Sequence, residues 1–237
     1  MSDLLCKRLH RKLERVPLTR YPFKLDDLPE NGIYFFYEVG EKWGHGGKKP
    51  RIVRVGTHRD GNFRSRIAEH YLLNEGNLPI DTTRPPPHDR SIFRKNIGRA
   101  LLHKARNPFL RVWEIDFTSK ESREKNGHLR NISNERRTEA KVTRLLRERF
   151  SFRFIRLEGQ KQRMGTKGLE GALIGTLAHC GKCKPSESWL GLYSPEDRIR
   201  ESGLWQVQHL SADPMDKEQQ RRFAKAVKHT ADWLKGD

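Results

Sequence analysis

The pattern of hydrophobic and polar positions along the chain predicts both strands and helices. β-Branched and aromatic residues cluster over residues 33–39, 51–55, 109–117 and 151–157, which favours strands. Apolar residues at helical spacing favour helices over residues 3–15, 90–104, 134–149, 167–178 and 214–234, and a further helix follows Asn62 and ends near Leu73. We therefore expect an α+β fold with a helical C-terminal extension.

The segments between these elements carry turn and loop signals. Asn31-Gly32 predicts a turn, and residues 40–50, which contain four glycines, predict a mobile basic hairpin loop. Residues 74–89, with three consecutive prolines, and the polar residues 118–134 are expected to be irregular. Asn62 and Thr166 are the expected N-caps of the helices that follow them.

The charge narrows the classes of function. The 237 residues include 48 Lys and Arg against 30 Asp and Glu, a formal net charge of +18, so the leading partner is nucleic acid. No apolar run approaches the ~20 residues that span a bilayer, which argues against a membrane protein. The N-terminus does not resemble a secretory signal, and three cysteines build no disulfide framework, so we expect a reducing cytoplasm.

Four side chains supply what the hydrolysis of a phosphodiester requires, namely an activated water, a cation on the phosphate and a metal ligand. Tyr34 lies in the first strand, Arg66 and His70 are four residues apart on one helix, and Glu170 lies in the first turn of a later helix. Each also has an ordinary interpretation: a strand aromatic, a solvated basic helix face and an exposed first-turn acid. Their order along the chain is more specific than any one of them.

That order resembles the GIY-YIG nuclease family. In the resemblance, Gly32-Ile33-Tyr34 is the GIY triplet, Gly56 ends the second triplet, Arg66 is the helix arginine and Glu170 is the metal ligand. The resemblance implies a small central antiparallel or mixed sheet flanked by helices. It also implies catalysis by Tyr34, Arg66, His70 and Glu170 with Mg²⁺ or Mn²⁺ held by Glu170, and cleavage of DNA.

The chain departs from the family pattern at three places. Arg54 stands where the second triplet has its tyrosine, and a positive charge there would stabilise the ionised form of Tyr34, so we count it with the catalytic residues. The asparagine that often follows the glutamate helix is absent, and Ser188 is the nearest candidate. The long stretch between Arg66 and Glu170 implies an insertion over about 80–150, as in the restriction-enzyme branch.

These inferences divide the chain into three parts. We expect a basic N-terminal arm over residues 1–30, a nuclease domain with its insertion over 31–200, and a helical extension over 201–237. Basic residues of the insertion, from Arg84 to Lys141, are expected mostly on phosphates. The other expected substrate contacts are His58, Arg59, Arg64, Lys48, Lys49 and Ser188.

Two functions remain open from the sequence. The first is a metal-dependent endonuclease on DNA, of a restriction type or another mobile-element or defence type, in which cutting of both strands would favour a homodimer. The second is a catalytically impaired nucleic-acid-binding protein on the same scaffold.

Two further patterns in the sequence are less specific. Cys180 and Cys183 form half of a zinc site, which Cys6 and His10 would complete. The clusters at Trp189 and Trp205 are interpreted as packing anchors rather than base-stacking platforms.

Overall fold

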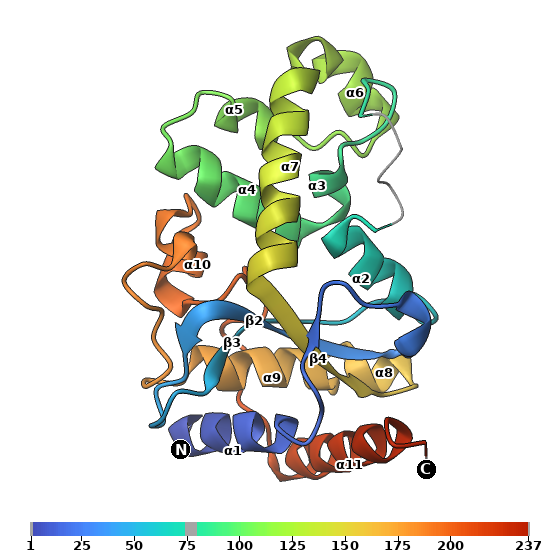
Figure 1. Cartoon of the computed structure of the whole chain (residues 1–237), viewed down its shortest axis with the longest axis vertical. Coiled ribbons are helices and arrows are strands. Elements are labelled where there is room, and N and C mark those ends of the chain that lie inside the picture. Colours follow the sequence, from blue (N-terminus) through green and yellow to red (C-terminus); the bar gives the residue numbers. More distant parts are fainter. Residues whose placement is uncertain (1, 74–79, 237) are drawn as a thin grey trace.

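The run of β-branched and aromatic residues after Gly32 forms the centre of an antiparallel sheet in the computed structural model, which describes residues 2–73 and 80–236 (Figure 1). β2 (Gly32–Lys42) pairs with β3 (Pro50–Gly56) on one side and with β4 (Phe150–Arg156) on the other, and β1 (Thr19–Arg20) pairs with the outer edge of β4. The strand order is β1-β4-β2-β3, and the predicted α+β fold with a small central sheet is confirmed.

Alternation along β2 sends successive side chains into two different cores. Ile33, Phe35 and Tyr37 face one core, and Tyr34 and Phe36 face the other. Both faces of the strand are buried, because helices cover both sides of the sheet (Figure 1).

The helices on the two faces come from different parts of the chain. The face of Phe35 is covered by α1 (Ser2–Leu13), α8 (Gln160–Arg163), α9 (Leu169–Ala178) and α11 (Lys217–Trp233). The face of Tyr34 is covered by α2 (Phe63–Tyr71), α4 (Ile92–Lys104) and α7 (Ile132–Arg149). The shorter helical segments are η1 (Leu25–Asp27), α3 (Pro87–Arg90), α5 (Leu110–Trp113), α6 (Lys120–Asn126), η2 (Gly127–Leu129), η3 (Leu190–Tyr193) and α10 (Asp197–Ser202).

The segment predicted as an insertion forms a helical lobe above the sheet, from α3 to α7 (Figure 1). A buried ion cluster joins its helices: Arg94 of α4 donates to Glu139 of α7 at 2.5 Å, and His88 Nδ1 lies 2.9 Å from the same carboxylate. Burial alone would raise the pKa of Glu139, but Arg94 and His88 lower it to about 2. The carboxylate is therefore ionised, and it links two helices that contribute side chains to the core beside Tyr34.

Two secondary-structure predictions in this lobe are wrong. Residues 109–117 contain α5 and turns instead of a strand, because Phe109 and Trp113, four residues apart, bury on one side of a helical turn. Residues 118–134 contain α6, capped by Ser119, and the start of α7. In the predicted connector, residues 74–79 lie outside the described part of the chain, and α3 occupies its end.

One of the two predicted N-caps is confirmed and the other is wrong. Asn62 is the N-cap residue of α2, although its side chain makes no capping hydrogen bond. The N-cap of α9 is Gly168 instead of Thr166. A Cβ at Gly168 would lie 2.5 Å from the carbonyl oxygen of Met164, so the close approach of two backbone segments sets this boundary.

The terminal segments share the cores of the sheet. Leu9 and Leu13 of α1 and Phe223 and Val227 of α11 are buried in the cluster that contains Phe35. The division at residues 30 and 200 stays a prediction. Within residues 2–73 and 80–236, none of the helices combines the length and the apolar character that crossing a membrane requires.

The two tryptophan clusters pack onto the sheet, as predicted. Trp189 and Trp205 are buried with ring centroids 5.0 Å apart, and both indole N–H groups donate to Glu38 on β2. The backbone N–H of Trp205 donates to the carbonyl of Val53, so this segment covers the free edge of β3.

Candidate active site

Tyr34 lies where β2 pairs with the last residue of β3. Its Cα partner in β3 is Gly56, and a Cβ at Gly56 would lie 2.3 Å from the phenol oxygen. The glycine therefore makes room for the aromatic ring across the end of the strand. The phenol oxygen lies 3.0 Å from His70 Nε2, and the side chain is buried.

Arg66 and His70 project from the same side of α2, as their spacing predicts. Phe63 at the start of α2 packs edge-on to the Tyr34 ring at 6.1 Å and holds the helix against the sheet. Arg66 donates to Glu69 at 2.8 Å and to the backbone carbonyl of Arg90 at 2.6 Å. Burial alone would lower the pKa of Arg66, but the nearby phenol of Tyr34 and the Glu69 carboxylate raise it, so the guanidinium is charged.

His70 is neutral and its proton can be placed. Burial, followed by the charges of Arg66, Arg54 and Arg94, lowers the pKa of His70 well below its usual value. Its Nδ1 lies 2.8 Å from the hydroxyl of Ser91, which already accepts the backbone N–H of Arg94 as the N-cap of α4.

The hydroxyl proton of Ser91 fixes the tautomer. Ser91 is fully buried, so its hydroxyl proton needs an acceptor within the protein. Among the described residues, that acceptor is His70 Nδ1, because the other contact of the hydroxyl, the backbone N–H of Arg94, is a donor. We therefore assign the His70 proton to Nε2, from which it donates to the oxygen of Tyr34.

Arg54 lies on β3 beside Tyr34, in the position of the second triplet's tyrosine. Its guanidinium donates to the carbonyl of Trp205 at 2.5 Å and lies 4.9 Å from the centre of the Phe93 ring. Burial lowers the pKa of Arg54, while Tyr34 and Glu170 act in the opposite direction. The buried side chain next to Tyr34 is therefore a cation, where the family pattern has a second tyrosine.

Glu170 reaches the same region from the other side of the sheet. It lies in the first turn of α9, and its Oε1 accepts the backbone N–H of Thr57 at 3.1 Å, one residue after Gly56. Burial raises the pKa of Glu170, and the charges of His209, Arg54 and Arg66 offset only part of this rise. The five predicted catalytic residues are therefore close enough to influence one another.

A cleft of about 560 Å³ opens beside these residues. It is lined by residues of α2 and of the turn that precedes it, together with Met164: Thr57, His58, Arg59, Asn62, Ser65, Arg66, Glu69 and Met164. Arg66 lines this cleft, and Thr57 connects it to Glu170.

The predicted substrate-binding residues near the cleft differ in whether their side chains already bond to the protein backbone. His58 accepts the N–H of Gly32 through Nε2 and lies 2.5 Å from the carbonyl of Arg59 through Nδ1, so both ring nitrogens hold the backbone. Arg64 donates to the carbonyl of Leu28 at 2.8 Å. Arg59 is exposed at the rim.

Three other predicted contacts lie at the far end of the β2–β3 hairpin. Lys48 and Lys49 belong to its turn, and Lys49 pairs with Glu14 at 2.7 Å. Ser188 lies 3.3 Å from Ser186, which bonds Glu41 near the end of β2. Tyr34 is eight residues from Lys42 along β2, a separation of about 26 Å in an extended strand, so these residues are not gathered around Tyr34.

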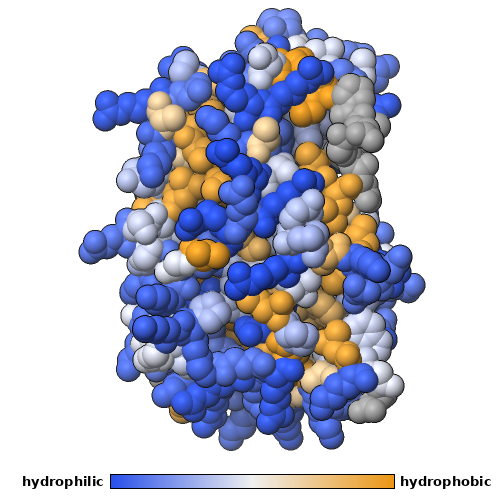
Figure 2. All heavy atoms as spheres, in the orientation of Figure 1, coloured by the Kyte–Doolittle hydropathy of each residue, from blue (hydrophilic) through white to orange (hydrophobic). Residues whose placement is uncertain are grey.

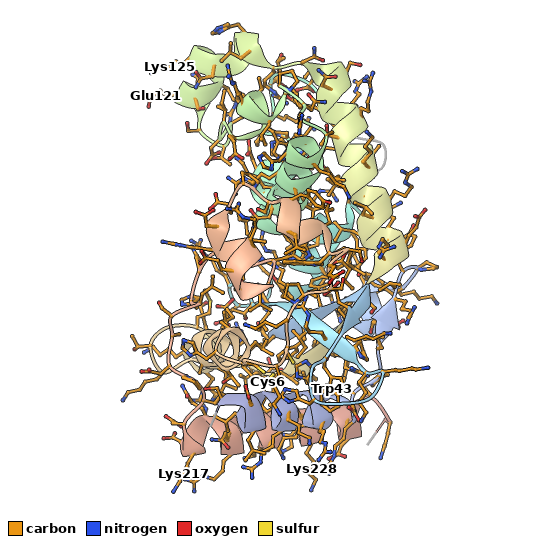
Figure 3. The ribbon with its side chains drawn as sticks, turned by 90° about the vertical axis from the view of Figure 1, so that its left-hand side faces the viewer. Cys6, Trp43, Glu121, Lys125, Lys217 and Lys228 are labelled. Atoms are coloured by element: carbon orange, nitrogen blue, oxygen red, sulfur yellow. The ribbon has the colours of Figure 1, made fainter. Side chains whose placement is uncertain are left out.

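The basic residues of the helical lobe fall into two groups. Arg94, Lys95 and Arg99 are used internally, where they pair with Glu139, Asp89 and Glu114. Exposed positions include Arg84, Arg90, Lys104, Arg106, Arg136, Arg137 and Lys141. Hydrophilic side chains spread over most of the face in Figure 2, and Lys217 and Lys228 extend from the outer side of α11 in Figure 3.

Two residues of the site were missed in the sequence. Ser91 orients His70, and its signal was the N-cap preference for serine just before a helical pattern that we began at residue 90. Thr57 donates its backbone N–H to Glu170, and a backbone contact of this kind leaves no trace in residue type.

The fold and the site together define a class: an α+β protein with a buried phenol, two arginines, a histidine and a carboxylate around the end of one hairpin. A comparison with protein-family models matches the GIY-YIG domain over residues 4–233. The chain therefore belongs to the GIY-YIG family, and this membership supports an endonuclease. Comparisons with curated proteins and with solved structures gave no match.

Proposed function

We propose that the protein is a metal-dependent endonuclease that hydrolyses DNA phosphodiester bonds. The observation that carries the proposal is the hydrogen bond between Tyr34 and a neutral His70, next to the two guanidinium groups of Arg54 and Arg66. The oxygen of Tyr34, with two cations and the N–H of His70 beside it, has the role of the general base that accepts a proton from the attacking water. Arg66, at the cleft, stabilises the charge that develops on the phosphate.

Glu170 fits the metal that the family requires. Its carboxylate is a hard oxygen donor, and Oε1 is fixed by Thr57 while Oε2 has no hydrogen bond to any described residue. One carboxylate suits Mg²⁺ or Mn²⁺, which would share its remaining coordination between water and phosphate oxygens. When bound, such an ion neutralises phosphate charge and assists the leaving oxygen.

The charge of the chain supports DNA as the substrate. Arg137, Lys141 and Arg144 are exposed at three- and four-residue spacing on α7, which packs against α2. A stripe of this kind follows a phosphate backbone without reading bases. The basic lobe added to the sheet favours a restriction-type or other defence nuclease, acting in the cytoplasm and as a homodimer if both strands are cut.

The test of catalysis uses supercoiled plasmid with Mg²⁺ or Mn²⁺. We expect nicked or linear product from the native protein and none from Glu170→Ala, while Glu158→Ala, at an exposed glutamate, cleaves normally. Equal cleavage by the native protein and Glu170→Ala would show that the assignment of the metal ligand is wrong.

The test of binding measures the salt dependence of duplex affinity. Replacement of Arg137, Lys141 and Arg144 by alanine should lower the slope of log affinity against log salt by up to about 3. The matched control replaces Lys217, Lys225 and Lys228, three exposed lysines of α11 on the other side of the sheet. A larger effect from the α11 variant would place the DNA on the opposite face.

The second candidate is a nucleic-acid-binding protein that has lost the chemistry. It is favoured by the engagement of Arg66 with Glu69 and with a backbone carbonyl, and by Arg54 in place of the second tyrosine. Salt-dependent binding without cleavage in Mg²⁺ or Mn²⁺ would select it.

A further inference from the structure

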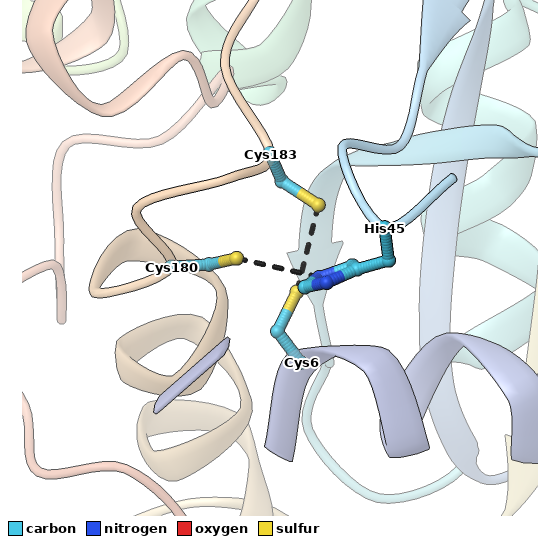
Figure 4. A group of neighbouring side chains, drawn as sticks. All are labelled: Cys6, His45, Cys180 and Cys183. Carbon is cyan, nitrogen blue, oxygen red and sulfur yellow. Dashed lines mark hydrogen bonds between the residues drawn. The ribbon is translucent and has the colours of Figure 1, made fainter. Parts of the chain in front are cut away.

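Three thiols and one imidazole converge at the hairpin end that lies away from Tyr34. Cys6 comes from α1, His45 from the β2–β3 turn, and Cys180 and Cys183 from the segment after α9 (Figure 4). Their four ligand atoms lie within 4.8 Å of one another, and all three cysteines are free and buried. Cys6 on α1 and Trp43 in the hairpin turn, both labelled in Figure 3, are buried in the same hydrophobic cluster.

Two of the distances between these atoms match those around a tetrahedral zinc ion. With Zn–S bonds near 2.3 Å and Zn–N bonds near 2.05 Å, tetrahedral angles put two sulfurs about 3.8 Å apart and a sulfur and a nitrogen about 3.6 Å apart. Cys6 Sγ lies 3.7 Å from Cys183 Sγ, and Cys180 Sγ lies 3.4 Å from His45 Nε2. A cluster of several irons would need its thiolates spread more widely than this.

The backbone is shaped to bring the four side chains together. A Cβ at Gly44 would lie 1.7 Å from the carbonyl oxygen of Lys182, so only glycine lets the hairpin turn approach the Cys180–Cys183 loop this closely. The N–H of Gly44 points to Cys183 Sγ at 3.4 Å, and the N–H of Gly181 donates to Asp3 at 2.8 Å. Backbone donors to a ligand sulfur are typical of thiolates that hold a metal.

The imidazole that lies with the three sulfurs is that of His45, and not that of His10 as the sequence predicted. The Nδ1 of His10 lies 2.9 Å from the carbonyl oxygen of Cys6, and its Nε2 accepts the N–H of Ile52 at 3.2 Å. Both ring nitrogens are therefore engaged with the backbone. His10 Nδ1 also lies 3.6 Å from Cys6 Sγ, but it is a ring nitrogen of His45 that lies within 4.8 Å of all three sulfurs (Figure 4).

We propose that Cys6, His45, Cys180 and Cys183 bind one structural zinc ion. Four protein ligands close the tetrahedron, so the ion has no open position for water or substrate. The site joins three segments, and Cys6 and Cys183 are separated by 177 positions in the sequence. Zinc here would fix the hairpin turn and the end of α9 against α1.

A disulfide is the alternative fate of these thiols, and the geometry disfavours it. A disulfide requires sulfurs about 2.05 Å apart, whereas Cys6 and Cys183 are at 3.7 Å, with Cys180 and His45 directed at the same point. An odd number of cysteines would also leave one unpaired, while a metal uses all three.

The test is the metal content of the full-length, untagged protein after gel filtration in metal-free buffer. Elemental analysis should find about one zinc and no iron per chain, because a closed four-ligand site retains its ion. Cobalt should substitute for zinc and give the visible absorption of tetrahedral Co²⁺ with thiolate charge transfer. A folded protein that contains no zinc, contains iron, or carries a disulfide would overturn the proposal.

Variants at the partly exposed ligand give the sharper comparison. His45→Ala should weaken zinc affinity roughly a hundredfold, since one of four ligands is lost from a structural site. His45→Cys should restore it, because a fourth thiolate completes the tetrahedron. The matched control is His179→Ala, an exposed histidine next to Cys180 that is outside the cluster.

The design remains decisive if a variant does not fold. In that case a thiol reagent added to the native protein should release one zinc as three thiols react, measured with a zinc-binding dye. Zinc that binds the His45→Ala and native proteins equally would remove His45 from the site, and zinc lost equally from His179→Ala would point to another location.

Discussion

The substitution Tyr34→Phe removes a single oxygen atom, and it distinguishes the catalytic role of the phenol from the packing role of the ring. The phenol oxygen bonds His70 at 3.0 Å, while the ring packs edge-on to Phe36 at 5.5 Å and to Phe63 at 6.1 Å. Phenylalanine keeps these ring contacts, so the core on this face of the sheet should stay packed.

The expected loss of rate follows from the role of the phenol as a base. Proton transfer by a positioned side chain contributes about 10²–10⁴-fold, which corresponds to roughly 3–5 kcal/mol in the barrier. We expect the single-turnover cleavage rate of Tyr34→Phe to fall about 10³-fold. Duplex affinity should not change, because Tyr34 is only 1% exposed and offers no surface to DNA.

The same change should lower stability by a separate route. It leaves the Nε2–H of His70 buried without an acceptor, which costs about 1–3 kcal/mol. For a chain of this length each kcal/mol shifts Tm by roughly 2–4 °C. We therefore expect Tm to fall by about 2–12 °C, measured by calorimetry at neutral pH, where His70 is uncharged in both variants.

Tyr37→Phe is the matched control, since Tyr37 is a buried tyrosine three residues along β2 on the opposite face. Its oxygen has no connection to the cleft, so cleavage should be unchanged. Cleavage by Tyr34→Phe within a few fold of the native rate, with Tyr37→Phe also active, would refute a base role for Tyr34 and would leave it as a packing residue.

Three other changes probe the neighbouring contacts. Glu170→Gln should abolish cleavage yet raise Tm of the metal-free protein at neutral pH. Burial raises the folded pKa of Glu170, so its ionised form opposes folding above that pKa, and the gain should vanish below the unfolded pKa of about 4.3. Gly56→Ala puts a methyl 2.3 Å from the Tyr34 oxygen and should cost about 1–3 kcal/mol in urea unfolding and lower the cleavage rate, whereas unchanged values would contradict the contact. Glu139→Ala leaves Arg94 buried without its partner and should cost about 3–5 kcal/mol in the same assay, and a loss below 1 kcal/mol would contradict the ion cluster.

The parts of the site predicted from sequence are those specified by local patterns. Alternation in β2 assigned Tyr34 to the face of Phe36, and the spacing of Arg66 and His70 placed them on one side of α2. The order of these elements also carried the resemblance, which supplied Glu170 more than a hundred positions later. Short-range periodicity was sufficient because each residue lies within a regular element.

The parts that could not be predicted depend on contacts between distant segments. Residues 109–117 alternate partly, but the burial of Trp113 against His88, with rings stacked at 3.6 Å, decides for a helical turn. His10 and His45 are both near Cys6, and only the path of the hairpin turn shows that His45 is the one grouped with all three sulfurs. The choice is made by backbone hydrogen bonds to His10, which a single sequence does not display.

Several arginines are buried and bond to the protein itself, so the net charge does not count the cations available to a ligand. Arg51, Arg54, Arg94 and Arg163 are all buried, and each donates to a carboxylate or to backbone carbonyls. These cations hold segments together and are not available to phosphate. The formal charge of +18 therefore overstates the number of cations that a nucleic acid could contact, and the exposed stripe on α7 is a better basis for estimating that number.

The candidate active site and the proposed zinc site lie at opposite ends of the same two elements. The β2–β3 hairpin holds Tyr34 and Gly56 at one end and His45 at the other. α9 holds Glu170 in its first turn and leads to Cys180 after its last, about 15 Å further along the helix. Zinc would therefore set the orientation of both elements without touching the cleft. Because Thr57 already ties Glu170 to the end of β3, loss of zinc should affect Tm before it affects the chemistry.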